Sequence, residues 1–469
     1  MPACTRPGVY VPRQTHDCDA AVLVRRHLPG FLARLEEAGH ALPGFVKAEL
    51  EGFATCGDFE RGFVRTACRT CGDELRVPFA CRGRGFCPSC MGRRMAEGAA
   101  LLVDHVLPAV GYRQWVLSFT GRMAVRLGYD QVLLAKVAEA FARAVMHDMR
   151  WSVKERHGLG SVEPLHAGVF TVVQRFRSDL GLYVHLHSLV TDGAFEEAGA
   201  DVRFLPARAP TPERMTAVLA QVHKALAAVA EDDDLDMDPA LAVCVQLALA
   251  GPHAVPPPEP AARPSLTVSA FDMHLHAATT VDGRDRKQLE RVCRYMLRPP
   301  FAHDAVKALE GRRVRVLFKA PWRSGVAHAD MTPDKFIARL CALVPPPGFH
   351  MVRYFGVLAS HHHLRARIVP PAAVPAPVLQ LALGLTGAAN DASGEPADAL
   401  PRPRRLAWAS LLARVFAIDV TVCRKCGGRM RILEVVSDPD DIARVLHGAR
   451  APPPPPRPHP PGQLLLFAR

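Results

Sequence analysis

The stretch YVHLHSLV, residues 183–190, places two histidines two positions apart in a run of apolar residues. Such a run predicts a buried β-strand, in which residues i and i+2 point to the same side. His185 and His187 are therefore expected side by side on one face of a sheet. Because a buried polar group without a partner costs about 1–3 kcal/mol, the pair indicates either a metal site or hydrogen-bonded core histidines.

The stretch FDMHLHAA repeats this arrangement at His274 and His276. For the first pair, the neighbouring predicted strand VVQRF offers Gln174 as a third polar group, and the three could hold a divalent ion against a phosphate. A phosphate held in this way next needs a nucleophile, which the strand itself does not identify.

A tyrosine on the predicted helix 285–298 is the candidate nucleophile. The apolar residues of this helix form one stripe at helical spacing: Leu289, Val292, Cys293, Met296 and Leu297. Tyr295 falls off that stripe, on the side of Gln288, Arg291 and Arg298. A tyrosine used only for packing should lie on the stripe. Tyr295 is therefore a candidate catalytic residue, and Arg291 and Arg298 are candidate contacts to DNA phosphates.

The cysteines cluster near the N-terminus, which indicates metal binding rather than a disulfide framework. Two C-x2-C pairs, Cys68/Cys71 and Cys87/Cys90, are separated by 15 residues, a spacing typical of a four-thiolate zinc ribbon. Cys56 and Cys81 are competing ligands. A third pair, Cys423/Cys426, is either a half-site completed by His447 or by a partner chain, or only a turn.

The formal net charge of +12 and the isoelectric point near 9.3 predict a polyanionic partner such as DNA. No apolar stretch reaches the roughly 20 residues of a membrane span, and the N-terminus does not read as a signal peptide. We therefore expect no membrane partner and a cytoplasmic location.

Several of these motifs together resemble one family. They are TACRTCG…FACRGRGFCPSCMGRR, VVQRF…VHLHSLVTDGAF, LERVCRYMLRPP, APWRSG, HMVRYFGVLASHHHLRARIVP and DVTVCRKCGGRMRILEVVSDP. In this order they are similar to the rolling-circle transposases of the insertion sequence 91 (IS-91) family. The resemblance implies an HUH endonuclease that nicks and rejoins single-stranded DNA through a 5′-phosphotyrosine. It places the catalytic Mg²⁺ or Mn²⁺ on His185 and His187 and the nucleophile on Tyr295, and it implies a structural Zn²⁺ near the N-terminus. Two-tyrosine members carry a second tyrosine one turn later, where this chain has Pro299, so a single-tyrosine version is expected.

The expected fold class is α+β, with an antiparallel sheet flanked by helices at its centre. Strands are expected at 113–120, 168–176 and 182–195, and helices at 131–149, 211–231 and 285–298. The expected organisation is a zinc-ribbon-like, DNA-contacting module (1–100), the HUH nuclease domain (101–370, with a Pro-rich loop at 251–265), a linker (371–405), a small module carrying CRKC (406–449) and a disordered Pro-rich tail (450–469).

The tail ends in QLLLF, which is similar to the peptide by which bacterial replication proteins bind the sliding clamp. Its candidate contacts are Gln463, Leu464, Leu466 and Phe467, and the alternative is an apolar tail without a partner. Two other functions remain open from the residues alone. One is a zinc-containing DNA-binding protein without chemistry. The other is a relaxase-like nickase for replication or mobilisation, although such enzymes usually carry their tyrosine near the N-terminus.

Overall fold

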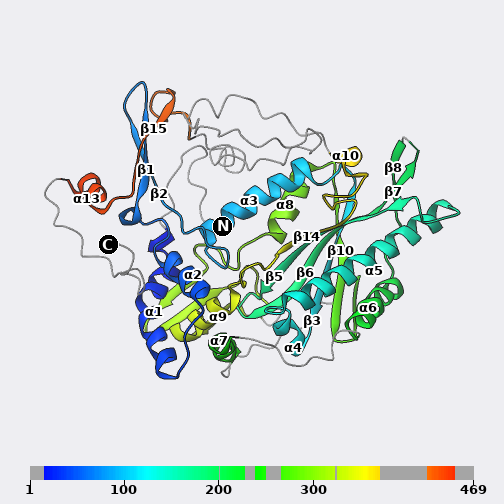
Figure 1. Cartoon of the computed structure of the whole chain (residues 1–469), viewed down its shortest axis with the longest axis horizontal. Coiled ribbons are helices and arrows are strands. Elements are labelled where there is room, and N and C mark those ends of the chain that lie inside the picture. Colours follow the sequence, from blue (N-terminus) through cyan, green and yellow to red (C-terminus); the bar gives the residue numbers. More distant parts are fainter. Residues whose placement is uncertain are drawn as a thin grey trace, which may run out of the picture.

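The computed structural model of the chain describes residues 15–199, 201–227, 238–249, 266–322, 325–369 and 420–448. Its centre is a six-stranded antiparallel sheet with the strand order β14-β5-β6-β3-β10-β9. These strands are β3 (Gly111–Phe119), β5 (Gly168–Phe176), β6 (Leu182–Thr191), β9 (Thr267–Ala270), β10 (Met273–Asp282) and β14 (Val352–Gly356). Helices cover both faces of the sheet (Figure 1), so the α+β fold class is confirmed.

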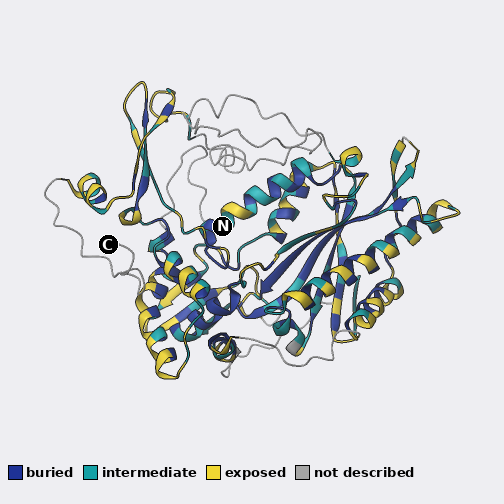
Figure 2. Cartoon of the chain, viewed as in Figure 1, coloured by how far each residue is buried: buried dark blue, intermediate teal, exposed yellow. Residues whose placement is uncertain are grey.

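The two faces of the sheet pack against different helices. One face lies against α5 (Gln131–His157), which in turn packs against α6 (Pro212–Ala227). The other face lies against α8 (Arg286–Met296), which packs against α3 (Pro88–His105). Strands β5 and β6, in the middle of the sheet, are buried along nearly all of their length (Figure 2).

Alternation along β6 explains how one strand serves both faces. Val184, Leu186 and Val190 join the core that includes α5, whereas Leu189 joins the core that includes α3 and α8. His185 and His187 have the same parity as Leu189, so they lie on the α8 side of the sheet.

Most of the expected elements are found with shifted ends. The predicted strands 113–120 and 168–176 correspond to β3 and β5, and helix 131–149 continues to His157. The stretch 182–195 is two strands, because the chain turns at Asp192, whose carboxylate accepts from Arg113 Nε at 2.9 Å. The second of them, β7 (Gly193–Ala198), lies between β4 (Leu165–His166) and β8 (Asp201–Pro206) in a separate sheet.

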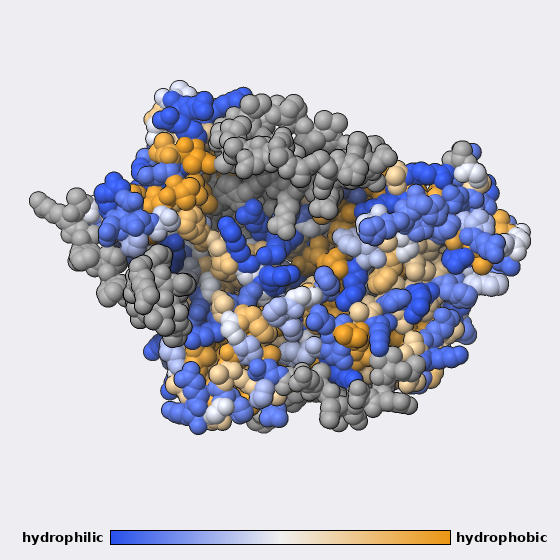
Figure 3. All heavy atoms as spheres, in the orientation of Figure 1, coloured by the Kyte–Doolittle hydropathy of each residue, from blue (hydrophilic) through white to orange (hydrophobic). Residues whose placement is uncertain are grey.

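A three-stranded sheet at the upper left of Figure 1, called the arm below, is built from segments near the N-terminus and near the C-terminus. There β1 (Phe63–Cys68) lies between β2 (Glu74–Pro78) and β15 (Met430–Val436), and both pairings are antiparallel. The C-terminal module expected to be separate therefore shares a sheet with the N-terminal module. Apolar side chains gather on the surface of this arm (Figure 3), and the exposed ones include Val422, Leu433 and Val435.

The remaining elements complete the flanks of the molecule. They are η1 (Thr15–Asp17), α1 (Asp19–Glu37), α2 (Gly44–Ala54), η2 (Phe59–Arg61), α4 (Gly121–Arg126), α7 (Pro239–Leu249), β11 (Val306–Leu309), β12 (Arg313–Leu317), β13 (His328–Met331), α9 (Pro333–Leu343), α10 (Arg365–Ile368) and α13 (Pro439–His447). The expected Pro-rich loop 251–265, linker 371–405 and tail 450–469, with its QLLLF peptide, lie outside the described residues. Among the described helices, none is long and apolar enough to cross a membrane.

Candidate active site and metal centres

The histidine pair occupies the centre of the sheet, on the face covered by α8. The rings of His185 and His187 lie 4.9 Å apart, measured between their centroids. Gln174 on β5 and Ser118 on β3 pair with His185 from either side, so their side chains share its face. The sheet register thus brings the predicted third group, Gln174, next to the pair.

Burial keeps both imidazoles neutral at neutral pH. Loss of hydration lowers the pKa of His185 to about 4 and the pKa of His187 well below its ordinary value, and the charge of Arg298 adds to both effects. His185 Nδ1–H donates to the carbonyl of Tyr183 over 3.0 Å, which leaves the lone pair of Nε2 free. A neutral ring with a free Nε2 is a good metal ligand.

The Nδ1 atom of His187 is held by a second glutamine. Gln114, on β3, has its side-chain nitrogen 3.0 Å from this atom, and both side chains are buried. A half-turn of the amide brings its oxygen to the same place, where it accepts Nδ1–H. In that orientation Gln114 leaves the Nε2 lone pair of His187 free for a metal.

The structure brings Tyr295 to the histidine pair. Its ring centroid lies 5.9 Å from that of His187, with the two ring planes at 88°. Helix α8 begins at the cap residue Asp285, whose carboxylate accepts from Gln288 N, and it carries Tyr295 in its last turn. The side chain of Tyr295 is 41% exposed, so a DNA strand can reach it.

Two cations flank the Tyr295 ring. The Lys319 ammonium lies 4.8 Å from the ring centroid, and the Arg298 guanidinium lies 5.4 Å from it. Arg298 also packs over Phe176 at 5.0 Å, and burial lowers its pKa. The predicted phosphate contact Arg298 is thus held beside the tyrosine.

Gln174 links the sheet to the end of α8. Its side-chain nitrogen donates to the carbonyl oxygen of Met296 at 2.8 Å and to that of Tyr295 at 3.3 Å. These carbonyls belong to the last turn of α8, where the helix supplies no partner. The other end of the amide, Oε1, is buried and has no hydrogen-bond partner among the described residues.

A pocket of about 410 Å³ opens beside the histidines and the tyrosine. Its lining residues are Gln114, Val116, His187, His276, Thr279, Gln288, Arg291, Val292 and Tyr295. Arg291, the other predicted phosphate contact, is exposed at this pocket. Of the second histidine pair, only His276 lines the pocket, and its Nδ1 lies 3.0 Å from Thr267 Oγ1.

Sequence reasoning did not identify Gln114 or Lys319. Gln114 reaches His187 because β3 pairs with β6. Lys319 lies between β12 and the motif APWRSG (320–325), and its approach to Tyr295 depends on how the chain folds. One signal was present: Gln114 is a polar residue directly before the apolar run WVL (115–117) of a predicted strand.

The cysteines form two clusters, and the single site expected from Cys68, Cys71, Cys87 and Cys90 is wrong. One cluster contains Cys56, Cys81, Cys87 and Cys90, and the other contains Cys68, Cys71, Cys423 and Cys426. Within each cluster the Sγ atoms all lie within 4.8 Å of one another. The two N-terminal pairs separate because β1 and β2 carry Cys68 and Cys71 to the far end of the arm, whereas Cys90 lies on α3.

The first cluster has the chemistry of a structural zinc site. Its sulfur atoms lie 3.4 Å (Cys81–Cys90), 3.7 Å (Cys56–Cys87) and 3.8 Å (Cys56–Cys90) apart. Four thiolates around one ion are typical of structural Zn²⁺, and a Zn–S bond of about 2.3 Å gives sulfur separations of roughly 3.8 Å. Cys56 and Cys81, which the sequence left as competing ligands, belong to this cluster.

Comparison with protein families gives two matches in different parts of the chain. Residues 23–119 match the family model "Transposase zinc-binding domain" of the IS91 type, and residues 168–365 match the model "Putative transposase". No curated protein and no solved structure matches the chain. The first match contains the whole Cys56 cluster, and the second contains Gln174, both histidines and Tyr295. The chain is thus a transposase of the IS91 family, a DNA-binding and nucleic-acid-cleaving enzyme.

Proposed function

We propose that this transposase nicks and rejoins single-stranded DNA as an HUH endonuclease, with Tyr295 as the nucleophile, in rolling-circle transposition. The observation that carries the proposal is the position of the Tyr295 ring, 5.9 Å from that of His187 on the face of the sheet that bears both histidines. Residues far apart in the sequence meet there, and the pocket beside them is open to solvent on the side of Arg291 and Gln288.

The residues at this site fit a divalent cation. His185 and His187 are neutral, and the buried Oε1 of Gln174 has no hydrogen-bond partner among the described residues. Two imidazoles and an amide oxygen would hold Mg²⁺ or Mn²⁺, the other positions being left for water and phosphate oxygens. When bound, the ion polarises the scissile phosphate.

Tyr295 supplies the covalent chemistry. Its Oη attacks the phosphorus in line, the Oη–P bond forms and the P–O3′ bond breaks. The phenolic proton leaves to solvent and the 3′ oxygen gains one, which gives a 5′-phosphotyrosine and a free 3′-OH. Lys319 and Arg298 lie beside the Tyr295 ring, and their positive charges would stabilise the negative charge of the phenolate and of the phosphate. Attack by another 3′-OH reverses the step and rejoins the strand without ATP.

The end of α8 supports a single-tyrosine enzyme. The helix ends at Met296, and Leu297 is its C-cap. Pro299 therefore lies beyond the helix, on a backbone that no longer follows helical periodicity. The side chain of residue 299 therefore does not lie one helical turn after Tyr295 on the same face of α8.

The test is to trap the covalent adduct. The purified protein would be incubated with Mn²⁺ and single-stranded oligonucleotides tiled across the DNA that flanks its gene, and denaturing electrophoresis and peptide mass spectrometry would follow. We expect an adduct on Tyr295 that Tyr295→Phe abolishes, with DNA binding retained in fluorescence anisotropy.

Tyr183→Phe is the matched control, since the Tyr183 ring also lies close to the pair, 5.5 Å from that of His185. This variant should form the adduct normally. An adduct that persists in Tyr295→Phe, or that maps to Tyr183, would refute the assignment. DNA binding without any adduct would favour a DNA-binding protein without chemistry.

A further inference from the structure

The second cysteine cluster is built from two copies of one turn. The sequence CRTCG (68–72) recurs as CRKCG (423–427), at opposite ends of the described chain. In each copy the glycine has a positive φ, 76° at Gly72 and 72° at Gly427. Each glycine N–H also donates to the carbonyl of the first cysteine, over 3.1 Å for Gly72 and 2.9 Å for Gly427. Left-handed glycines of this kind allow a tight turn to aim two side chains at one point.

The sulfur atoms of the two turns face one another in crossed pairs. Cys68 Sγ lies 3.4 Å from Cys426 Sγ, and Cys71 Sγ lies 3.5 Å from Cys423 Sγ. These distances are far above the roughly 2.05 Å of a disulfide and close to the roughly 3.8 Å expected around a tetrahedral zinc ion. The backbone N–H of Thr70 points at Cys68 Sγ over 3.3 Å, as is favourable for a thiolate.

Contacts around the sulfurs hold the turns together in register. The N–H of Arg69 donates to the carbonyl of Arg429 at 2.9 Å, and β1 pairs with β15 from Cys68 opposite Met430 onward. The Lys425 ammonium lies 2.6 Å from the Asp73 carboxylate across the same junction. The cluster therefore joins two segments that already form one small sheet.

We propose that Cys68, Cys71, Cys423 and Cys426 bind a second structural Zn²⁺, which fastens the C-terminal strand β15 to the N-terminal arm. The matched zinc-binding domain ends at residue 119, so it contains only half of these ligands. The arm has little apolar interior of its own, since the cluster under β1 contains only Phe63, Val436 and Ile442 as buried residues. A small sheet with so few buried residues gains much of its stability from a metal.

The experiment measures zinc in the full chain, by elemental analysis and by native mass spectrometry under reducing conditions. After dialysis against a weak chelator, which removes ions bound more loosely than by four cysteines, we expect two Zn²⁺ per chain. Cys423→Ser and Cys68→Ser should each retain one, because the Cys56 cluster is untouched, while Cys18→Ala, a buried cysteine outside both clusters, should retain two.

Hydrogen exchange provides a readout independent of catalysis. Loss of the second ion should increase exchange of the β1 and β15 amides at least tenfold and leave the amides of β5 and β6 protected. One zinc in the wild type, or two in both serine variants, would overturn the proposal. If a serine variant loses both ions, the loss reflects unfolding of that variant. Cys426→His replaces a thiolate with another zinc ligand, so this variant should stay folded and bind two ions.

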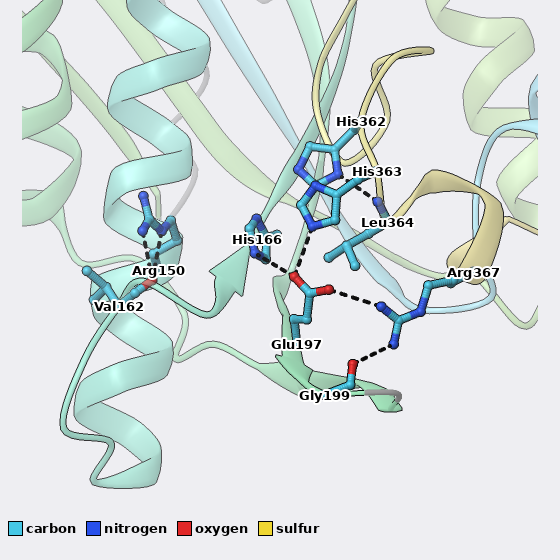
Figure 4. Close-up of polar contacts among 9 residues, drawn as sticks. All are labelled: Arg150, Val162, His166, Glu197, Gly199, His362, His363, Leu364 and Arg367. Carbon is cyan, nitrogen blue, oxygen red and sulfur yellow. Dashed lines mark hydrogen bonds and ion pairs between the residues drawn. The ribbon is translucent and has the colours of Figure 1, made fainter.

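A different set of residues forms a second candidate centre, near the turn of the β7–β8 hairpin (Figure 4). His166 on β4, Glu197 on β7 and His363 in the loop after β14 place one ligand atom each within 4.8 Å of the others. Glu197 Oε2 lies 2.9 Å from His363 Nε2 and 3.8 Å from His166 Nε2. Arg367 holds the other oxygen, Oε1, at 3.0 Å and so fixes the direction of the carboxylate.

We infer that these three residues form a site for a transition-metal dication such as Zn²⁺ or Ni²⁺. Two imidazoles and one carboxylate suit such ions, with water in the open position. The neighbouring His362 is not a ligand, since its Nδ1 accepts from Leu364 N and its ring stacks on His363 at 4.6 Å. A bound ion would join the hairpin to the loop that leads into α10.

Calorimetric titration of the full chain with Ni²⁺, after its cysteine clusters have been filled with Zn²⁺, tests this site. We expect two further ions, one at His185 and His187 and one at this site, and only the second should bind at least tenfold more weakly in His166→Ala and in His363→Ala. His361→Ala, an exposed neighbour in the same loop, is the matched control and should bind normally. Equal binding by all three variants, or none by the wild type, would overturn the inference.

Discussion

The side-chain nitrogen of Gln174 donates to the main-chain carbonyl of Met296 over 2.8 Å, and these residues lie 122 positions apart in the sequence. This bond fixes the end of the tyrosine helix against the strand next to the histidines. Gln174 has two roles in the proposed mechanism: its nitrogen positions α8, and its buried oxygen without a hydrogen-bond partner would be a metal ligand.

Two substitutions separate these roles. Gln174→Leu removes both and leaves buried carbonyls unsatisfied, so the free energy of unfolding should fall by about 1–3 kcal/mol and adduct formation should be lost. Gln174→Glu keeps an oxygen ligand but removes the donor. It should still bind Mn²⁺, while its adduct forms at least tenfold more slowly. Urea denaturation and electron paramagnetic resonance of Mn²⁺ measure the two effects, and equal Mn²⁺ affinity in Gln174→Leu would exclude Gln174 as a ligand.

Gln114 should act through the tautomer of His187. When the Gln114 oxygen accepts Nδ1–H of His187, the Nε2 atom of His187 is free to bind the metal. Loss of a residue that orients a metal ligand typically weakens binding about 10–100-fold, so Gln114→Leu should weaken Mn²⁺ binding by this factor. Gln114→Glu, which can only accept at that position, should retain the affinity. Titration of Mn²⁺ against both variants checks this, and unchanged affinity in Gln114→Leu would remove the positioning role.

Lys319 should accelerate the attack by Tyr295. Its ammonium lies 4.8 Å from the centre of the phenol ring, so its charge favours the negative charge that develops on the phenolate. We expect Lys319→Met to slow adduct formation about tenfold and Lys319→Arg to preserve most of the rate. Lys307→Met, an exposed lysine on β11, serves as the control and should be neutral in the same single-turnover assay.

A tyrosine introduced at position 299 should not replace Tyr295. Because α8 ends before Pro299, the new side chain would not extend the face that carries Tyr295. The double variant Tyr295→Phe, Pro299→Tyr should therefore form no adduct with single-stranded DNA. An adduct mapped to position 299 would show that the helix can extend, and it would weaken the single-tyrosine proposal.

Local patterns in the sequence predicted the centre of the site. The period of two along residues 183–190 places both histidines on one face, and the apolar stripe of helix 285–298 leaves Tyr295 off the core. Both are properties of single elements. Which strand lies beside β6 is a property of the whole sheet, so Gln114 could not be connected to His187 from spacing alone.

The thiolate sites show the same limit. Cys71 and Cys87 are near in sequence and suggest one ribbon, but the real partner of Cys71, Cys423, lies 352 positions away. The spacing of cysteines in the sequence identifies only pairs that lie close together in the chain. The CRKC motif, which has no second pair after it, indicated that its other ligands come from a distant segment. The clamp peptide, the linker and the Pro-rich loop stay predictions, since they lie outside the described residues.

The pairing of β1 with β15 has a consequence for synthesis on the ribosome. Arg65 on β1 forms ion pairs with Glu74 and with Glu434, the latter 369 positions later in the sequence. At roughly 5–20 residues per second, translation of the intervening stretch takes about 20–70 s. During that interval β1 has one free edge and two unmatched thiols, while every strand of the central sheet, from β3 to β14, is synthesised. The first strand of the described chain to be synthesised is thus among the last to reach its final form.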